Sequence, residues 1–491
     1  MLPVPPSSSG PVVAQAFQRM AGLVIAIAWL SLSAQLDTLM GAEGLLPANE
    51  TLIAIEAAGL DFVEAPTLFS SGVHDATLRA GTLLGVFLSL CGGLGLWPRL
   101  CFPASGALYL SYTVLGGDFL AFQWDNLLVE TCALLAFLPR RRPAPWVHLS
   151  FRVLLFKLYF ESGVAKWQSH LGDWQDGSAM THYYETAPLP AWLGYYAHQL
   201  PPWVHRAESW AVLLLELPLA LLVFGPRRAR LLLCTALTLF QLINTATANY
   251  GFFTYLSLAL HLFLLSDRDL VALRWFRVPH GPLPPVPVSV RTMGRLVGAV
   301  ALSGYLGGSL TVGLTHLGAR NLREPVLSLA RPLVALRLTN AYHLFGHITR
   351  TRIEPEFQLR VDGQWQAQPL HYKPGPEDRR PPYVAPHQPR VDFRLWFYGL
   401  SFRRGMPRYV RALLERLCDR ASSVQSLFPA PLPPRPEAVR VAFHRYTFTE
   451  PRALSGPGRY WKREPVGHTR PRACDGGHAI DAPRRAPSTG P

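Results

Sequence analysis

One stretch of this sequence, residues 159–190, concentrates side chains that could do chemistry at the edge of a membrane. It starts at the end of an apolar segment and at once introduces carboxylate, ammonium and imidazole groups: Glu161, Lys166, His170, Asp173, Asp176, His182 and Glu185. A lysine held in a low-dielectric site has a depressed pKa and could serve as a base near neutral pH. The alternative is an interfacial anchor, in which Trp and Tyr lie at headgroup depth and the lysine reaches toward water.

Polar residues also interrupt or follow two other apolar segments. Asp125 and Glu130 lie within residues 119–138, and Asn249 directly follows another apolar segment. In lipid such groups need partners from neighbouring helices, and they mark either structural contacts or a functional cavity. The sequence leaves both open, and one hypothesis pairs Asp125 or Glu130 with Lys166. Seven residues therefore form a candidate polar core: Asp125, Glu130, Lys166, Asp173, His182, Glu185 and Asn249.

Motifs of familiar catalytic chemistry are absent from the sequence. It has no GxSxG nucleophile elbow, P-loop, HExxH, or GxGxxG between a strand and a helix. His343 and His347 have the spacing of two metal ligands on a helix, but no third ligand is near them. The six cysteines show no CxxC or Cys/His spacing, which predicts small-residue packing rather than a disulfide framework or a metal site. We therefore expect no metal and no cofactor.

The elements that must position these residues are membrane helices. Hydrophobic residues make up 49% of the chain and charged residues 16%, which indicates a membrane-embedded part joined to a polar one. A helix needs roughly 20 apolar residues to span a bilayer. The sequence predicts an α-helical multi-span membrane domain of about nine helices at residues 17–318, after a disordered N-terminus at 1–16. The candidate spans are 17–36, 79–97, 100–116, 119–138, 149–164, 210–224, 231–247, 251–266 and 293–314.

Basic clusters orient these spans. Arg140–Arg142, Arg227–Arg230 and Arg268–Arg277 follow the fourth, sixth and eighth candidate spans. All three fall on one side if the N-terminus is cytoplasmic, as the positive-inside rule requires. The loop 37–78, with seven acidic residues and no Lys or Arg, then lies on the opposite side together with the C-terminal part of the chain. Asn49 in that loop begins an Asn-Glu-Thr sequon, a glycosylation site if the loop is lumenal in a eukaryote.

Residues 319–465 read as an extracytoplasmic α+β domain. Two runs around Asp362-Gly363 predict a β-hairpin over 356–372, because Asp-Gly suits a type I′ turn. Apolar residues at helical spacing predict a helix within 406–428, and alternation predicts a strand over 439–449. Residues 466–491 are rich in Pro, Arg and Gly, a composition typical of a disordered tail.

The net charge of +15 belongs to the C-terminal third of the chain. Residues 320–491 contain 29 basic and 14 acidic side chains, and 29 − 14 = 15. Such a surface could contact nucleic acid, anionic headgroups or an acidic protein. Because the sequence has no zinc-finger spacing and no RNA-binding signature, we do not expect nucleic acid as a partner.

Motifs along nearly the whole chain, from about residue 17 to 465, resemble those of the lipase maturation factors. Each is weak alone, but together and in this order they are specific. They are FQWDNLLVE (122–130), GVAKWQSHLGDW (163–174), HYYETAPLP (182–190), NYGFF (249–253), KPG (373–375), PPYVAPHQPRVDFRLWF (381–397) and YWKRE (460–464). Ala187 departs from the family pattern, which has Gln at this position.

The resemblance implies an integral membrane folding and maturation factor that assists secreted, lipase-type client proteins, and we favour a non-enzymatic one. It implies the endoplasmic reticulum membrane with a lumenal C-terminal domain if the source is eukaryotic. The Arg-rich, Lys-poor composition suggests a bacterial or high-GC source, and a bacterial member would lie in the plasma membrane. Aromatic and Arg side chains carry interface energy. We accordingly expect the C-terminal domain to face the client, through Arg390, Asp392, Trp396 and Trp461.

A second resemblance gives an enzymatic alternative. The pattern YF–GV–K–DW–G between residues 159 and 177 is also similar to the transmembrane domain of vitamin K-dependent γ-carboxylases. In that group a lysine is the base that deprotonates reduced vitamin K, and the motif places it at Lys166. The motifs from 373 to 464 belong to the maturation-factor pattern, so we favour the folding factor.

Overall fold

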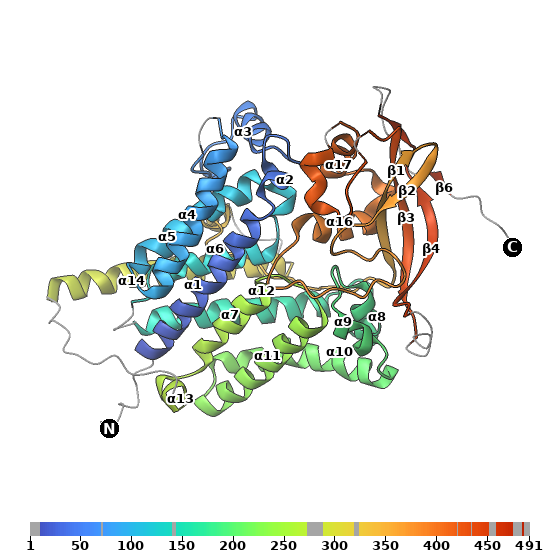
Figure 1. Ribbon diagram of the computed structural model, residues 1–491. Helices are drawn as coiled ribbons and strands as arrows, with labels where there is room; N and C mark the ends of the chain where they lie inside the picture. The colour runs from blue at the N-terminus through green and yellow to red at the C-terminus, as the bar shows by residue number, and fades with distance from the viewer. Residues whose placement is uncertain are drawn as a thin grey trace.

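The chain forms a helical domain with a smaller α+β domain on one end (Figure 1). The computed structural model describes residues 10–69, 72–139, 144–272, 288–318, 324–419, 421–433, 435–450, 458–474 and 484–485. The Arg140–Arg142 cluster lies outside the described residues. The helices before residue 340 are α1 Pro11–Ser33, α2 Leu36–Met40, α3 Ala48–Ala57, α4 Asp75–Leu94, α5 Pro98–Leu115, α6 Gln123–Leu135, α7 Pro145–Trp167, α8 Ala179–Thr186, α9 Trp192–His198, α10 Pro202–Glu216, α11 Arg227–Thr247, α12 Phe253–Leu260, α13 Asp267–Ala272, α14 Val288–His316 and α15 Glu324–Ala335.

Each of the nine predicted spans overlaps a helix, but the number that crosses the bilayer stays a prediction. Five helices of the described chain are long and apolar enough to span: Pro11–Ser33, Asp75–Leu94, Pro202–Phe224, Arg227–Thr247 and Thr292–His316. The fourth predicted span is α6, which has 13 residues and is shorter than the roughly 20 that a span needs. The fifth is α7, which is long but includes three basic residues and Glu161.

Outward faces of these helices fit contact with lipid. Large apolar side chains on α4 and α11 are exposed, among them Leu83, Phe87, Leu232 and Leu239. A soluble monomer rarely leaves contiguous apolar patches of this kind on its surface. Lipid tails would cover them at no cost, and the protein is therefore a membrane protein.

Helix α1 runs through the bundle and marks its two ends. At its start, Asp267 of α13 accepts hydrogen bonds from the backbone N–H groups of Val12 and Val13 at 3.2 and 3.0 Å. Its C-terminal end meets the α+β domain, where Ser31 Oγ lies 2.9 Å from His387 Nδ1. At about 1.5 Å per residue, its 23 residues separate the two ends by roughly 34 Å.

Small residues let α1 and α4 lie in close contact. A Cβ atom on Gly22 would come within 2.6 Å of Gly93 Cα, and one on Gly85 within 2.2 Å of the Trp29 ring. The close approach of small residues is a common way for membrane helices to associate, because dispersion contacts replace the absent hydrophobic driving force.

The C-terminal domain is an antiparallel sheet packed against helices. Its strands have the order β2-β1-β3-β4-β6, and β5 pairs with β3. Helix α16 lies so close to β1 that a Cβ atom on Gly399 would be 2.0 Å from Ile353 O. The elements are β1 Arg352–Val361, β2 Gln364–Gln368, α16 Arg390–Ser401, α17 Arg408–Asp419, α18 Ala421–Val424, β3 Ala438–Phe448, β4 Trp461–His468, β5 Arg472–Ala473 and β6 Arg484–Arg485.

Local predictions for this domain are confirmed. β1 and β2 form the expected hairpin, with Val361 paired to Gln364. Asp362 and Gly363 have φ values of 48° and 73°, the positive values that a type I′ turn requires at both central positions. The predicted helix corresponds to α17 and α18, and the predicted strand to β3.

Parts of the two ends predicted to be disordered belong to regular elements. Helix α1 begins at Pro11, so residues 11–16 are helical rather than part of a disordered N-terminus. Residues 466–468 belong to β4 and residues 472–473 to β5, which pairs with β3. Sheet pairing orders this Arg- and Pro-rich segment, a long-range effect that composition does not reveal.

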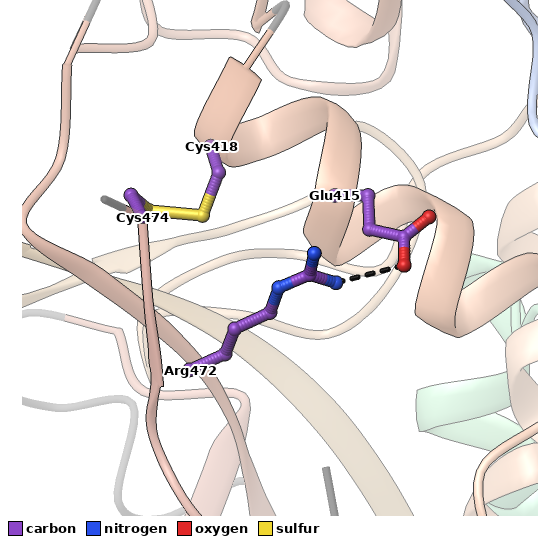
Figure 2. Close-up of a disulfide and its surroundings, with 4 residues drawn as sticks. All are labelled: Glu415, Cys418, Arg472 and Cys474. Carbon is purple, nitrogen blue, oxygen red and sulfur yellow. Dashed lines mark hydrogen bonds and ion pairs between the residues drawn. A yellow bond between two sulfur atoms is a disulfide. The ribbon is translucent and has the colours of Figure 1, made fainter. Parts of the chain in front are cut away.

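A disulfide between Cys418 and Cys474 closes the C-terminal domain (Figure 2). The prediction that the cysteines only pack is wrong for this pair, which is 56 residues apart in the sequence and shows no motif. Beside it, Arg472 donates a 2.8 Å hydrogen bond to Glu415 of α17. Disulfide and ion pair together attach the chain after β4 to α17. Cys91, Cys101, Cys132 and Cys234 are free.

Replacing Cys418 with serine should destabilise the C-terminal domain by about 2–4 kcal/mol, because the unfolded chain regains the freedom that the cross-link removes. The free energy of unfolding of the full-length protein in detergent measures this loss. Cys91→Ser, at a half-buried free thiol, is the matched control and should have a smaller effect. Equal stability of the two variants would contradict the cross-link.

Candidate functional site

The candidate polar core lies along the junction between the helical domain and the chain that follows residue 338. We call this junction the docking interface. It joins α6, α7, α8 and the Asn249 turn to the segments 339–352 and 382–396 and to β3. Six of the seven predicted core residues make side-chain hydrogen bonds across it.

Asp125 forms the most buried ion pair of the docking interface with Arg390. Arg390 Nη1 lies 2.7 Å from Asp125 Oδ2, and Nη2 lies 2.7 Å from Oδ1, a bidentate arrangement. Tyr109 Oη donates to Asp125 Oδ1 at 2.7 Å, and Arg390 Nη1 donates to Phe119 O at 3.1 Å. Asp125 lies in the first turn of α6, where the helix dipole also favours a negative charge.

Glu130, one turn further along α6, is saturated with partners. Its two carboxylate oxygens accept from Lys157 Nζ at 2.9 Å, Tyr305 Oη at 2.8 Å, Tyr342 Oη at 2.9 Å and Asn340 Nδ2 at 2.7 Å. The ammonium of Lys157 also lies over the Tyr305 ring, 5.4 Å from its centre. A carboxylate with four donors has no lone pair left for proton transfer.

Lys166 pairs with Glu216 of α10. Its Nζ donates to Glu216 Oε2 at 2.7 Å and to Leu344 O at 2.8 Å, and lies 5.4 Å from the centre of the Trp174 ring. The hypothesis that Lys166 pairs with Asp125 or Glu130 is therefore wrong. Those two carboxylates already hold Arg390 and Lys157.

A small cavity adjoins Lys166 and Glu216. Its volume is about 40 Å³, and its walls include Tyr159, Trp174 and Gln241. A cavity needs roughly 10–15 Å³ on this measure to admit one water molecule, so this one has room for only a few. Substrate pockets are typically about 300–1,000 Å³.

The rest of the 159–190 stretch also binds the following chain. Asp173 accepts from Ser169 Oγ at 2.5 Å and from the N–H of Ile348 at 2.7 Å. Glu185 Oε2 accepts from the N–H of Phe448 in β3 at 2.6 Å. Carboxylates thus satisfy backbone donors of the C-terminal chain that would otherwise be buried without partners.

Burial keeps two histidines in and after this stretch, His182 and His198, neutral at neutral pH. Burial lowers the pKa of His198 to about 4, so its 3.8 Å approach to Glu185 is no ion pair there. Burial raises the pKa of Glu185. His182 is half-buried on α8, and burial followed by the charge of Arg350 lowers its pKa. Of the seven predicted core residues, His182 is the exception: in the described structure its side chain makes no hydrogen bond to the C-terminal chain.

Asn249 connects three segments with its amide. Its Nδ2 donates to Leu189 O at 3.2 Å and to Pro382 O at 2.9 Å. Its Oδ1 accepts from the N–H groups of Val384 and Ala385 at 2.7 and 3.0 Å. All four hydrogen-bonding positions of the amide are filled, which makes Asn249 a structural residue of the docking interface.

Three of the four residues expected on a client-facing surface lie in the interior. Arg390, Asp392 and Trp461 are exposed by 1%, 2% and 1%, so this expectation is wrong for them. Their side chains contact other parts of the protein interior. Trp396 is half-buried, and its Nε1 donates to Thr186 O at 2.8 Å.

Asp392 belongs to a buried charged cluster of the C-terminal domain. Lys373 Nζ lies 2.7 Å from Glu354 Oε2, and Arg352 Nη2 lies 2.5 Å from Glu354 Oε1. Burial lowers the pKa of Lys373 to about 8, although the nearby negative charge of Glu354 acts to raise it. Burial raises the pKa of Asp392 to about 6. Arg352 also donates to Pro188 O at 3.1 Å, so the cluster extends into the docking interface.

Sequence reasoning missed the partners that complete these contacts. Lys157, Glu216, Asn340 and Tyr342 lie in unremarkable sequence contexts, and their partners are far from them along the chain. The scarcity of lysine was one signal in the sequence that could have indicated buried ion pairs. Of the four lysines, three (157, 166 and 373) are buried in ion pairs.

The helix that would bring His343 and His347 together as metal ligands is not formed. The two lie outside any helix, and each ring packs against a different neighbour: His316 at 5.2 Å and His170 at 4.9 Å between ring centres. In the described part of the chain no three His, Cys, Asp or Glu side chains are grouped as metal ligands. The arrangement of the site is that of a structural junction.

Arg390→Met should destabilise the protein by about 3–5 kcal/mol, because it leaves Asp125 buried without its cation. Thermal unfolding of the full-length protein in detergent measures the loss. The double variant Asp125→Leu/Arg390→Met removes both charges and should recover most of it.

Arg394→Met is the matched control for this prediction. Arg394 lies one turn further along α16 and pairs with Asp118 at 2.9 Å, but both side chains are partly exposed. Exposed pairs contribute about 0–1 kcal/mol, so the control should unfold close to the wild type. A control loss as large as that of Arg390→Met would contradict the importance of burial.

Comparison with known proteins identifies both parts of the chain. The family model of the lipase maturation factor transmembrane domain matches residues 12–272. The model of the lipase maturation factor C-terminal domain matches residues 338–471.

Curated relatives align over most of their length. The chain is 30% identical to lipase maturation factor 2 of Mus musculus, over 93% of this chain and 82% of that protein. It is 29% identical to lipase maturation factor 1 of Bos taurus, over 91% of this chain and 86% of that protein. No solved structure matches it significantly. From the two domain matches and these relatives, the chain belongs to the lipase maturation factor family.

Proposed function

We propose that this protein is an integral membrane maturation factor that helps secreted, lipase-type client proteins reach their active fold. The observation that carries the proposal is the family match over both domains, at residues 12–272 and 338–471. Relatives named lipase maturation factor 1 and lipase maturation factor 2 align with 91% and 92% of this chain, which also supports the proposal.

The geometry supports assistance without chemistry. Glu130 and Asn249 have all their hydrogen-bonding positions filled, and Asp125 is bound on both oxygens. The charges of the helical domain bind the C-terminal domain through ion pairs and hydrogen bonds, so a client would meet both domains together. Such a surface can cover the apolar groups of a partly folded protein by non-covalent contact alone.

The carboxylase-like alternative, with Lys166 as a base, is not favoured. Lys166 is held in an ion pair with Glu216 at 2.7 Å, and the adjoining cavity of about 40 Å³ is far too small for a quinone-sized substrate. The Lys166 ammonium also donates to Leu344 O at 2.8 Å, so a substrate would have to displace both of these partners to reach it.

The double variant Lys166→Met/Glu216→Leu separates the two functions. Lys166→Met alone should abolish maturation, because it leaves Glu216 buried without a partner, a loss of about 3–5 kcal/mol. The double variant should restore most of it. The specific activity of a secreted lipase, co-expressed with each variant in cells that lack their own factor, is the measurement.

An enzyme that uses Lys166 as its base would stay inactive in the double variant. That outcome would favour catalysis, and equal lipase activity with and without the wild-type protein would reject the maturation function itself.

The membrane orientation is a further part of the proposal. We place the C-terminal domain outside the cytoplasm, in the lumen of the endoplasmic reticulum or, for a bacterial source, outside the plasma membrane. The Cys418–Cys474 disulfide supports this, because disulfides persist in oxidising compartments. Arg227 pairs with Asp269 of α13, at the end of the bundle opposite the C-terminal domain. The positive-inside rule assigns such a basic cluster to the cytoplasmic side, which leaves the C-terminal domain on the other side.

Single cysteines at exposed positions test this orientation. Arg228→Cys lies at the α13 end and Ala430→Cys on the C-terminal domain. The test uses sealed vesicles whose outer surface is the extracytoplasmic face of the membrane. A membrane-impermeant maleimide should label Ala430→Cys in these vesicles and should label Arg228→Cys only after detergent is added. The reverse pattern would invert the proposed topology.

The glycosylation of Asn49 stays a prediction within this orientation. Asn49 is partly buried in the first turn of α3, and its Oδ1 accepts a 2.7 Å hydrogen bond from Val73 N–H. It lies at the same end of the bundle as the C-terminal domain, since its neighbour Glu50 pairs with Arg408.

A further inference from the structure

Helix α3 and the chain that follows it expose an apolar surface. Ile53 is 65% exposed, and Phe62 and Leu68 are each 59% exposed. Leu60 and Val63 add to the same surface. None of these residues belongs to a helix that could span the membrane, because α3 has 10 residues and the others lie in the loop before α4.

This surface is hollowed into a groove. The groove has a volume of about 710 Å³ and is lined by Leu52, Ile53, Leu60, Phe62 and Phe69. That volume lies in the range of typical binding pockets, about 300–1,000 Å³, and accommodates several apolar side chains. The apolar groove therefore has room for part of a protein chain.

The charge around the groove is negative. Glu56 and Asp61 line it, and the loop 37–78 has seven acidic residues and no Lys or Arg. Anionic headgroups would be repelled by such a rim, whereas a segment with Lys or Arg beside its apolar residues would be attracted.

The groove lies at the end of the bundle that carries the C-terminal domain. Glu50 of α3 pairs with Arg408 of α17, and Thr38 Oγ1 lies 2.9 Å from Ser426 Oγ. A client in contact with the C-terminal domain would therefore reach the groove as well.

We propose that this groove binds an apolar, positively charged segment of the partly folded client. The inference rests on the proposed function and assigns a client-binding surface to the helical domain. Apolar side chains of the segment enter the groove, and its Lys or Arg side chains lie beside Glu56.

Binding of two designed peptides tests the proposal. One is a fluorescein-labelled amphipathic peptide of leucine and lysine, and its counterpart has glutamate in place of lysine. Fluorescence anisotropy with the full-length protein in neutral detergent should show tighter binding of the lysine peptide. Ile53→Ser and Phe62→Ser should each weaken it at least about ten-fold, because each removes an exposed apolar side chain that the bound peptide would bury.

Charge reversal and a distant control complete this test. Glu56→Lys should remove the preference for the lysine peptide while leaving the apolar groove intact. Leu100→Ser changes an equally exposed apolar residue at the start of α5, near the opposite end of the bundle, and should bind as the wild type does. Equal binding by the wild type, Ile53→Ser and Phe62→Ser would overturn the inference.

The competing occupant is the bilayer itself. A bimane label on Phe62→Cys, in phosphatidylcholine nanodiscs, should be quenched by aqueous iodide and not by brominated acyl chains. Quenching by the brominated lipid would assign the surface to the membrane and overturn the proposal. If the wild type raises lipase activity while the groove variants bind peptide normally, the inference fails and the maturation function stands.

Discussion

The bidentate pair of Asp125 and Arg390 is the interaction on which the arrangement of the two domains depends. It joins the first turn of α6 to the first residue of α16, with both N–O distances at 2.7 Å. A buried carboxylate without a cation would cost several kcal/mol. The C-terminal domain therefore has one low-energy position on the helical domain, and the other contacts of the docking interface fit that position.

The same constraint explains why the polar residues of the helical domain are paired with one another or with the C-terminal chain. A charged group in a low-dielectric interior is stable only when its partner and its hydrogen bonds are provided. Glu130 accepts hydrogen bonds from Lys157, Asn340 and two tyrosines. Lys166 donates hydrogen bonds to Glu216 and Leu344. Groups that are fully satisfied give rigidity and specificity of docking, which suits a protein that acts through its surface.

A consequence concerns how the two domains can be studied. Removing the chain after residue 320 would take Arg390 from Asp125 and Pro382 from Asn249, so the truncated helical domain would have buried polar groups that lack these partners. Loss of client maturation in such a truncation would not locate the client-binding surface. Single substitutions at exposed positions, away from the docking interface, answer that question without disturbing the fold.

The sequence by itself determined the local elements and the family. Apolar length located the helices, alternation and Asp-Gly located the hairpin, and ordered motifs indicated the lipase maturation factors. These features depend on residues within one segment, where helix period and turn conformation act. The sequence also selected Asp125, Glu130, Lys166 and Asn249 correctly as buried polar residues.

Only the tertiary structure decided what those residues bind. Arg390 lies 265 residues from Asp125, and Cys418 lies 56 from Cys474. No local pattern encodes such pairs, because a charge in a membrane helix requires a partner without specifying which. For the same reason the sequence predicted surface positions for Arg390, Asp392 and Trp461 from their residue types. Only the packing of the folded chain showed that they lie in the interior. Their burial follows from the way the C-terminal chain folds back onto the helical domain.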